Sequence, residues 1–284
     1  MTDVEVAANP KAIIEHIESR SDRLETPCGE GTMVWHSWGA GPPLVLLHGG
    51  NGSWRHWIRT IPFFAPRYRV VAADLPGLGE SARGPQPDTQ AGIARIVADG
   101  LDRVIGSDTR YHIAGFSFGG MISGVVAARH GMRVRSLTLN GPGGLGSQRR
   151  AFALVSVRDQ VGAERIARHT TNLGRLMLHD PAKIDDLALE LQEWHSTRNR
   201  LRTPLLSRSM ALVEALAKVK TRVGAIYGEF DAPANPNLRE RAALLRSIVP
   251  DIDFRVICGA GHWTAYEAPD EFNTTLQEML SAAE

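Results

Sequence analysis

A Gly-x-Ser-x-Gly motif is the feature of the sequence that most directly suggests chemistry. It lies in the run Tyr-His-Ile-Ala-Gly-Phe-Ser-Phe-Gly-Gly, residues 111–120, between a short apolar stretch and a helix-like stretch over 121–130. Gly115 and Gly119 leave room for a tight strand-to-helix turn that exposes the Ser117 hydroxyl. The N-terminus of the helix then faces developing negative charge. The alternative is a glycine-rich turn with a solvated serine.

A nucleophilic serine needs a base, and the base needs a group that orients it. Asp231 follows the apolar run 223–227, and His262 follows the run 254–257 in a glycine-rich loop. The order Ser117, Asp231, His262 is one in which a Ser-His-Asp triad is known to occur. We therefore predict these three as the catalytic residues. Glu229 and Asp253 are alternative acids, but Glu229 comes two residues early and Asp253 stands at a strand start, on the wrong edge.

The run His48-Gly49-Gly50 follows another apolar stretch, 43–47, and supplies a second place for an oxyanion donor. We predict that the backbone N–H groups of Gly50 and Phe118 form the oxyanion hole, where donors of this kind stabilise acyl-transfer intermediates. A glycine-rich loop with a structural histidine is the alternative. Asn51 is adjacent, and its side chain is predicted either to bind substrate or to brace the loop.

Aromatic residues cluster around these motifs and predict a small apolar site. Trp54 follows the oxyanion loop, Phe116 precedes the serine and Trp263 follows the base. We expect these three to contact substrate, with core packing as the alternative for each. For Trp35 and Trp38 we expect core packing.

The elements that position these residues alternate along the chain. Apolar strand-like runs are expected at 43–47, 68–73, 111–114, 134–139, 223–227 and 254–257, with an edge hairpin over 24–38. Helices are expected at 57–65, 89–105, 122–130, 238–248 and 269–283. Apolar strands alternating with helices indicate an α/β fold whose mostly parallel sheet is covered on both faces.

Residues 141–209 break this alternation and form the one expected insertion. They contain candidate helices at 151–157, 161–168, 172–178, 183–198 and 204–217, without a convincing strand. We therefore expect a core domain of residues 1–140 and 210–284 and a helical cap of residues 141–209. Ligands of open α/β sheets bind outside the carboxyl ends of the strands, so the cap is predicted to close over Ser117.

A second glycine-rich motif suggests an alternative function, dinucleotide binding. Residues 141–146, Gly-Pro-Gly-Gly-Leu-Gly, fit a dinucleotide-binding pattern, and Asp159 follows about twenty residues on. That pattern opens a βαβ unit, whereas no sheet strand follows here for about eighty residues. We interpret the segment as a hinge into the cap and expect no cofactor.

Composition excludes several classes of protein. A formal net charge of +1 provides no field that would attract nucleic acid or an acidic membrane. Cys28 and Cys258 do not make a disulfide framework, and no His/Cys/Asp cluster has metal-ligand spacing. No basic leader followed by an apolar run begins the chain, and no stretch approaches the ~20 apolar residues of a membrane span. We expect a cytoplasmic protein whose partner is a small-molecule substrate.

Asn9-Pro10 opens a short amphipathic helix before the main domain, with Ile13, Ile14 and Ile17 on one face. This helix is expected to pack either on the body of the domain or on a second subunit. The second alternative predicts a homodimer.

Taken together, the chain resembles the α/β-hydrolase superfamily along nearly its whole length. The resemblance rests on five segments: residues 48–50, 74–81, 115–120, 228–231 and 261–262. It implies the α/β-hydrolase fold with a helical cap and a serine hydrolase activity. It does not identify the substrate, because this fold hosts many reactions.

A narrower resemblance concerns the tail of the chain. Gly261-His262-Trp263, followed by Glu267 and residues 270–273, is similar to the meta-cleavage-product hydrolases, which cleave a carbon–carbon bond in vinylogous diketone acids. That family uses a cap arginine on the substrate carboxylate, a role that this resemblance offers to Arg198 or Arg200. Trp194 and Arg198 share one helix face, so both are predicted to look into the pocket.

Two departures separate this chain from that narrower family. Residues 51–54 replace its Gly-Pro-Gly loop, and Phe116 replaces the Asn that usually precedes the nucleophile. We therefore expect an esterase or lactonase acting on a small, largely apolar acyl compound, with a C–C bond hydrolase as the alternative. A receptor that holds its ligand without turnover is a further alternative.

Overall fold

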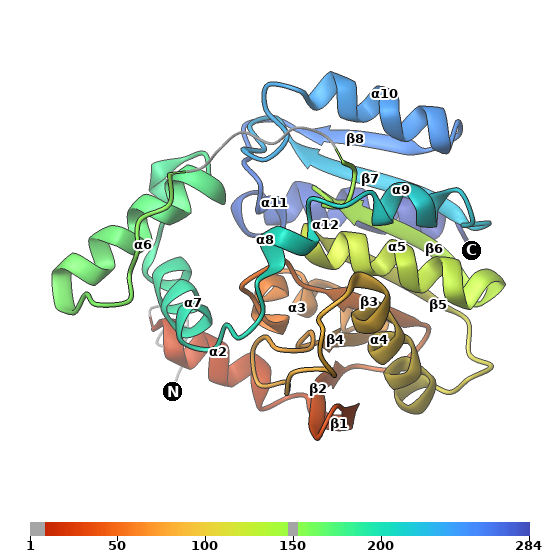
Figure 1. Cartoon of the computed structure of the whole chain (residues 1–284), viewed down its shortest axis with the longest axis horizontal. Helices are drawn as coiled ribbons and strands as arrows, with labels where there is room; N and C mark the ends of the chain where they lie inside the picture. Colours follow the sequence, from red (N-terminus) through yellow and green to blue (C-terminus); the bar gives the residue numbers. More distant parts are fainter. Residues whose placement is uncertain (1–8, 147–152) are drawn as a thin grey trace.

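The computed structural model describes residues 9–146 and 153–284. It contains one eight-stranded sheet in the order β1-β2-β4-β3-β5-β6-β7-β8 (Figure 1). β1 pairs antiparallel with β2 and β2 with β4, and the remaining neighbours are parallel. The strands are β1 (Asp22–Cys28), β2 (Gly31–Trp38), β3 (Pro43–Leu47), β4 (Arg69–Ala73), β5 (Tyr111–Phe116), β6 (Val134–Asn140), β7 (Arg222–Gly228) and β8 (Asp253–Ile257).

Helices connect these strands. They are α2 (Pro10–Glu18), α3 (Ile61–Phe64), α4 (Gln90–Ile105), α5 (Phe118–His130), α6 (Gly162–Leu176), α7 (Asp186–Thr197), α8 (Thr203–Leu206), α9 (Ala211–Leu216), α10 (Leu238–Ile248), α11 (Thr264–Glu267) and α12 (Pro269–Ser281). Short 3₁₀ helices occur at η1 (Trp54–Trp57), η2 (Gly131–Arg133) and η3 (Pro181–Lys183). The architecture is the α/β-hydrolase fold that the sequence predicts.

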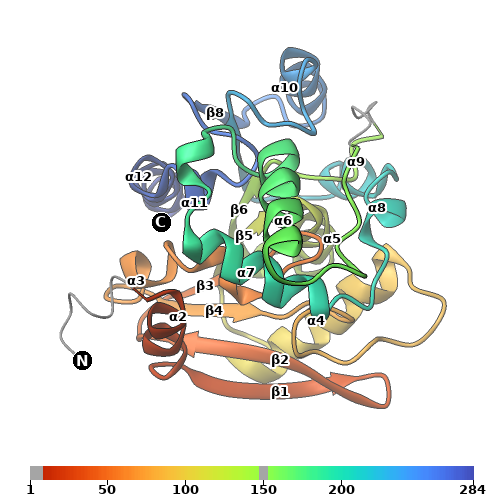
Figure 2. The ribbon, with the colours of Figure 1, turned by 90° about the vertical axis from the view of Figure 1, so that its left-hand side faces the viewer.

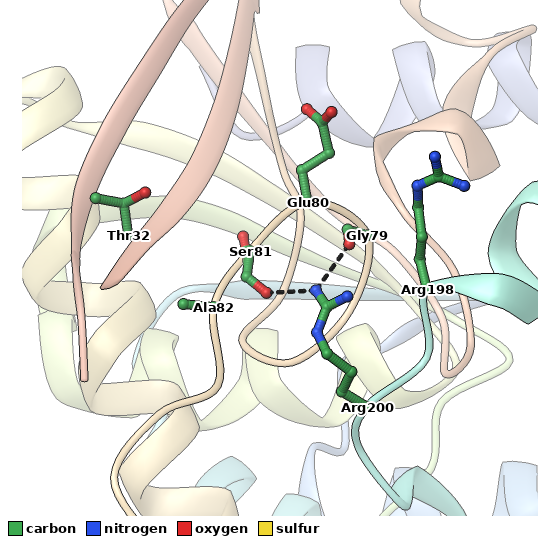
Figure 3. Close-up of a pocket in the computed structure, with 7 residues that line it drawn as sticks. All are labelled: Thr32, Gly79, Glu80, Ser81, Ala82, Arg198 and Arg200. Carbon is green, nitrogen blue, oxygen red and sulfur yellow. Dashed lines mark hydrogen bonds between the residues drawn. The ribbon is translucent and has the colours of Figure 1, made fainter. Parts of the chain in front are cut away.

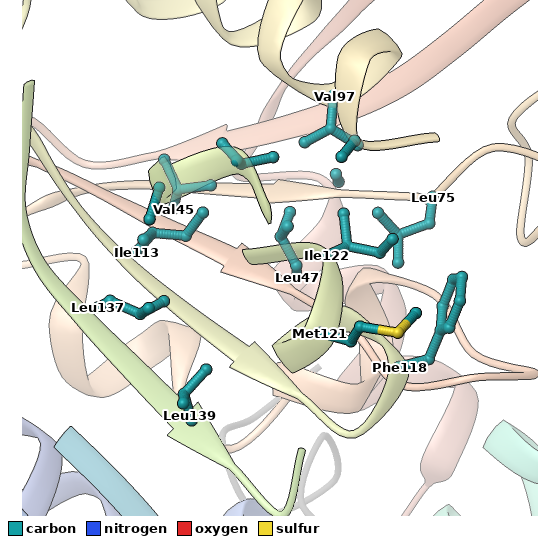
Figure 4. Close-up of a cluster of buried hydrophobic side chains, with 14 of the residues drawn as sticks. Val45, Leu47, Leu75, Val97, Ile113, Phe118, Met121, Ile122, Leu137 and Leu139 are labelled. Atoms are coloured by element: carbon teal, nitrogen blue, oxygen red, sulfur yellow. The ribbon is translucent and has the colours of Figure 1, made fainter. Parts of the chain in front are cut away.

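Side-chain alternation along the central strands builds a core on each face of the sheet. In β3, Val45 and Leu47 point to one face, while Leu44 and Leu46 point to the other. The first face packs under α4, α5, α9 and α10, and Figure 4 shows this cluster around Ile122. The second face packs under α2, α3, α11 and α12. Figure 2 shows α3 and α12 on the opposite side of the sheet from α4 and α5.

The parallel strands bring their carboxyl ends to one edge of the sheet. Leu47 pairs with Gly115, Phe116 with Asn140, and Gly228 with Ile257. The loops that leave β3, β5, β7 and β8 therefore start beside one another, although they are far apart in the sequence. This register places the residues that the sequence analysis singled out on one side of the molecule.

Between β6 and β7 the described chain forms the helices α6 to α9 and no strand. α6 and α7 stand beyond the carboxyl ends of the parallel strands (Figure 1, left) and in front of the sheet in Figure 2. α9 packs back against α5 through Leu212, whose side chain reaches Gly124. The helices α6 and α7 with their loops, residues 153–202, are called the cap below.

Several boundaries in this region differ from the sequence predictions. The helix expected at 151–157 is wrong over 153–157, where the chain is not helical, and residues 151 and 152 lie outside the described part. The two helices expected at 161–168 and 172–178 are one helix, α6. The helix expected at 204–217 is split into α8 and α9, and that at 57–65 into η1 and α3.

The N-terminal helix α2 packs on the body of the domain. Asn9 caps it by accepting the N–H of Lys11, and Ile14 and Ile17 are buried. Trp38 Nε1 donates a hydrogen bond to the Ile17 carbonyl at 2.7 Å. Trp35 is also fully buried, as expected, with its Nε1–H on Thr26.

Candidate active site

Ser117 occupies a strained turn between β5 and α5. Its backbone has φ 51° and ψ −110°, a region that non-glycine residues rarely adopt. Ser117 N–H donates to the Asn140 carbonyl, and its own carbonyl accepts the N–H of Gly143, so both neighbouring loops hold the turn. Ser117 is partly exposed although its neighbours in the turn are buried. The turn thus presents the hydroxyl beyond the sheet.

The glycines on either side of the serine are needed for close backbone contact. A Cβ on Gly119 would lie 2.4 Å from the Leu47 carbonyl oxygen, and one on Gly115 would lie 2.4 Å from that of Gly119. The G-x-S-x-G spacing therefore lets α5 press against the ends of β3 and β5.

His262 and Asp231 form a buried pair. His262 Nδ1 lies 2.8 Å from Asp231 Oδ2, and the two residues are 3% and 1% exposed. Asp231 also accepts the N–H of Ala234 on Oδ1, which fixes the carboxylate. The His262 ring lies 4.8 Å from the ring of Phe116, the residue before Ser117. The structure thus brings the dyad to the serine loop.

The alternative acids make other contacts. Glu229 Oε2 accepts the N–H of Gly259, and Asp253 pairs with Arg255 at the start of β8. Gly141, the first glycine of the dinucleotide-like motif, has φ 49°, and a Cβ there would lie 2.6 Å from Asp231 Oδ2. The absence of a side chain at Gly141 therefore leaves room for the Asp231–His262 pair.

The loop after β3 lies directly against the turn that holds Ser117. A Cβ on Gly49 would be 2.8 Å from the Phe116 ring and 3.4 Å from Ser117 Cβ. His48 anchors the loop: its Nε2 accepts the Leu75 N–H and its Nδ1 contacts the Gly49 carbonyl at 2.6 Å. Phe118 is the first residue of α5, so its N–H has no acceptor within the helix. This arrangement can place Gly50 and Phe118 N–H groups around one oxygen.

Two further histidines stand beside this loop. His56 Nδ1 accepts the Gly49 N–H at 3.2 Å, and its ring lies 4.8 Å from that of His195 on α7. Both are about 2% exposed. Burial, together with neighbouring histidines, holds the pKa of each well below the usual value. Both imidazoles are therefore neutral, and His56 carries its proton on Nε2 because Nδ1 is an acceptor.

The predicted substrate residues are spread over two environments. Phe116 and Trp263 lie in the site, where the Trp263 ring is 4.9 Å from that of His56 and its Nε1–H donates to the His56 carbonyl. Asn51 lies beside Gly50 with φ 52° and a buried Oδ1 that has no partner among the described residues. Trp54 instead packs against the Trp38 ring at 5.3 Å.

Trp194 and Arg198 lie on the side of α7 that faces α2. The Arg55 guanidinium lies 3.7 Å from the Trp194 ring centre and that of Arg198 lies 4.2 Å from it. Arg55 also pairs with Glu18 of α2 at 3.1 Å. The residue of α7 that reaches the site is His195, whose Nε2 lies 2.9 Å from Ser53 Oγ.

A cleft of about 460 Å³ lies beside the loop after β4 (Figure 3). Its wall includes Glu80, Arg198 and Arg200, and none of the three predicted catalytic residues lines it. Arg200 donates to the carbonyls of Gly79 and Ser81 at 2.9 and 2.8 Å. These bonds tie the end of the cap to the core.

A second cleft, of about 290 Å³, contains His262 in its wall and is called the His262 cleft below. It lies between the end of α6 and the loops after β7 and β8. Met177, Leu178 and Phe230 give it an apolar side, and the cationic Arg175 is also among its lining residues. His179 of the cap stacks on Phe230 at 3.7 Å.

Two buried carboxylates hold this region together. Glu267 Oε1 accepts the N–H groups of His179 and Asp180, and Oε2 accepts that of Gly261 beside His262. Asp74 accepts the N–H groups of Trp54 and Glu80. Burial raises the pKa of Asp74 to about 7, against the lowering effect of these two donors.

Within the described residues one group has ligand atoms close enough for a metal ion: Glu18, His36 and Glu80, within 4.8 Å of one another. Arg55 already pairs with Glu18, and Arg23 lies 3.7 Å from Glu80. These guanidinium groups compensate the carboxylate charge that would attract a cation. In the same part of the chain no helix is both long and apolar enough to span a membrane.

The chain belongs to the alpha/beta hydrolase family, whose model matches residues 44–275. It is 29% identical to the dihydrolipoyllysine-residue acetyltransferase component of the acetoin cleaving system of Pseudomonas putida, over 93% of this chain and 71% of that protein. It is 26% identical to a 2-hydroxy-6-oxo-6-phenylhexa-2,4-dienoate hydrolase of Burkholderia cepacia, over 86% of this chain and 89% of that protein. The protein is a hydrolase.

A solved structure shows the same fold. An esterase from Rhodococcus sp. superposes with a TM-score of 0.76 and 19% identity, covering 92% of this chain and 99% of that one. At this identity the likeness concerns the fold alone.

Proposed function

We propose that this protein is a serine hydrolase that cleaves carboxylic esters or lactones of small, largely apolar acids. The observation that carries the proposal is the buried Asp231–His262 pair, 2.8 Å apart, beside the strained and partly exposed Ser117. A serine on such a turn, with an oriented imidazole next to it, is the arrangement that acyl transfer requires.

The chemistry follows from the placement of these groups. His262, with Nδ1–H directed at Asp231, takes the Ser117 proton on Nε2 as Oγ attacks the carbonyl carbon. The N–H groups of Gly50 and Phe118 stabilise the oxyanion. His262 then returns the proton to the leaving alcohol, and water releases the acid by the reverse sequence.

The surroundings of the dyad favour a largely apolar substrate. Met177, Leu178 and Phe230 line the His262 cleft, and the rings of Phe116, His56 and Trp263 surround the serine loop. The two neutral histidines add hydrogen-bonding groups without charge. A largely apolar acyl group is buried here without the free-energy cost of desolvating a charge.

A test uses the 4-nitrophenyl esters of acetate, butyrate and octanoate, with Ser117→Ala as the blank. Steady release of nitrophenolate by the wild type, absent in the variant, supports the proposal. One equivalent of nitrophenolate without further turnover would instead indicate a receptor. No release from any ester or lactone would contradict ester hydrolysis.

A C–C bond hydrolase is the second candidate. It is favoured by the curated relatives, which include hydrolases of 2-hydroxy-6-oxo-6-phenylhexa-2,4-dienoate and 2-hydroxy-6-oxo-2,4-heptadienoate at 26% and 27% identity. Adding 2-hydroxy-6-oxo-6-phenylhexa-2,4-dienoate and following the loss of its absorbance decides between them. A kcat/KM for this compound above that for every ester would make it the better description.

A further inference from the structure

The side chain of Thr203, the first residue of α8, lies against the loop after β3 that contains Gly50. A Cβ built on Gly50 would lie 2.4 Å from Thr203 Oγ1 and 3.1 Å from Thr203 Cβ. The hydroxyl is thus the part of this side chain nearest to Gly50. Thr203 is 5% exposed, so the contact is enclosed. A side chain that enters from the helical insertion therefore ends beside one of the two proposed oxyanion donors.

The Thr203 hydroxyl has no hydrogen-bond partner within residues 9–146 and 153–284. Its backbone groups are engaged, because its N–H donates to Leu201 and its carbonyl accepts the Ser207 N–H. By contrast, the hydroxyls of Thr26 and Thr264 are hydrogen-bonded to Trp35 and Asn140. A hydroxyl that has no partner in the protein and lies beside an active-site loop is free to donate a hydrogen bond to a ligand bound there.

The chain around Thr203 is tied to the core on both sides. Arg200 donates from its backbone N–H to Gly77 and from its guanidinium to Gly79 and Ser81. On the other side, the Ser207 carbonyl accepts the N–H of Gly144, which follows β6. A donor fixed in this way needs little reorganisation when charge develops nearby, which is the property that makes an oxyanion donor effective.

We propose that Thr203 is a catalytic residue whose Oγ1–H donates a hydrogen bond to the substrate carbonyl oxygen as it becomes an oxyanion. It would act as a third donor beside the N–H groups of Gly50 and Phe118. No proton is transferred in this step; the hydroxyl keeps its proton and stabilises the negative charge. This inference rests on the proposed acyl-transfer function.

The test compares Thr203→Val with Thr203→Ser. Valine has nearly the shape of threonine without the hydroxyl, whereas serine keeps the hydroxyl without the methyl group. With 4-nitrophenyl butyrate we expect Thr203→Val to lower kcat by about tenfold or more, since loss of one oxyanion donor costs on the order of 10²–10³ in a known enzyme. Thr203→Ser should retain kcat within about threefold, consistent with a retained donor.

Inhibition provides a readout that packing would not change. An alkyl trifluoromethyl ketone adds to the serine and places an oxyanion in the hole, whereas the corresponding methyl carbinol cannot. Thr203→Val should weaken inhibition by the ketone by the same factor as kcat/KM and leave the carbinol unaffected. Thr138→Val is the control, because it removes a threonine hydroxyl in β6 that likewise has no hydrogen-bond partner in the described chain. It should leave kcat unchanged.

The outcomes separate the two proposals. Wild-type turnover with Thr203→Val equal to wild type in kcat and ketone affinity would overturn the role of Thr203 and leave the serine hydrolase intact. Absence of wild-type turnover would instead contradict the proposed function. If Thr203→Val does not fold, Thr203→Ala answers the same question, because a smaller side chain cannot clash with Gly50; wild-type kcat in Thr203→Ala would equally overturn the role.

Discussion

Ser53 and His195 join the core to the cap through one hydrogen bond, with Ser53 Oγ 2.9 Å from His195 Nε2. Both residues are buried, and Ser53 also caps η1 by accepting the Arg55 N–H. The His195 ring packs in turn on His56, which accepts the Gly49 N–H. A short chain of contacts therefore connects α7 with the loop proposed to hold the oxyanion.

This buried histidine group predicts a loss of stability in acid. The pKa values of His56 and His195 are lowered in the folded state, chiefly by burial, and that of His48 falls to about 4. The unfolded chain binds protons at these sites as pH falls through about 6.5, and the folded chain does not. Their stabilising contribution is thus present above that pH and lost below it.

Urea unfolding between pH 8 and pH 5 measures this effect. His56→Asn keeps an acceptor for the Gly49 N–H and removes one titrating site, so its free energy of unfolding should fall less steeply than that of the wild type. Equal slopes for the wild type and His56→Asn would show that His56 titrates alike in both states.

Ser117→Ala should abolish turnover while leaving the fold intact. Loss of the serine from a known triad lowers kcat by ~10⁶. Turnover of 4-nitrophenyl butyrate and the thermal midpoint give the two readouts. Retention of more than about a tenth of the activity in a clean preparation would refute Ser117 as the nucleophile.

Asp231→Asn should lower kcat severely, whereas Glu229→Gln should have little effect. Asp231 contacts His262, and the equivalent change costs ~10⁴ in a known serine protease because the imidazole tautomer is wrong. Glu229 only accepts the Gly259 N–H. Kinetics of both variants with one ester provide the comparison, and the reverse ranking would assign the acid to Glu229.

Gly119→Ala should destabilise the protein, by about 1–3 kcal/mol as for other overpacked sites. The added methyl group would lie 2.3 Å from the His48 carbonyl oxygen, which is backbone and cannot turn aside. Gly174→Ala in α6 is the control, because its nearest neighbour would be Ile184 Cδ1 at 3.5 Å. There we expect a gain of about 0.5–1 kcal/mol from helix propensity. Denaturant unfolding distinguishes the two, and equal effects would contradict the steric explanation.

Substrate charge gives the last prediction. Arg198 stacks on Trp194 and lines the cleft that does not contain the proposed catalytic residues, so Arg198→Ala should affect 4-nitrophenyl hemisuccinate and its methyl ester alike. Arg175→Ala, in the His262 cleft, should raise KM for the free acid alone, because a guanidinium binds a carboxylate through paired hydrogen bonds. A loss confined to the free acid in Arg198→Ala would restore that arginine as the carboxylate ligand.

The sequence predicts the sheet well because its central strands are short apolar runs that end in glycine-rich loops. The run at 43–47 matches β3, and the helix at 238–248 matches α10. The serine, acid and base could be proposed from their order because parallel strands place successive carboxyl ends at one edge. Which acid meets the base depends on side-chain contacts that the sequence does not specify.

The positions of His56 and His195 beside the site were not predicted from the sequence, although the spacing of the buried residues in α7 indicates that His195 faces inward. Leu187, Leu191 and His195 recur every four residues, and this is the buried face of the helix. Trp194 and Arg198 are also four residues apart, but they belong to the neighbouring row of the helix, which faces α2. For His56 and Thr203 the sequence offers no comparable pattern, because loops and a four-residue helix position them.

Glu267 gives the fold a constraint that matters for protein engineering. A single carboxylate holds two N–H groups of the cap, from His179 and Asp180, and one from Gly261 next to the proposed base. Exchanging the cap for that of another hydrolase would leave this buried charge short of donors unless the graft restores the same turn. The unit that can be transplanted between such enzymes is therefore the cap together with residues 261–267.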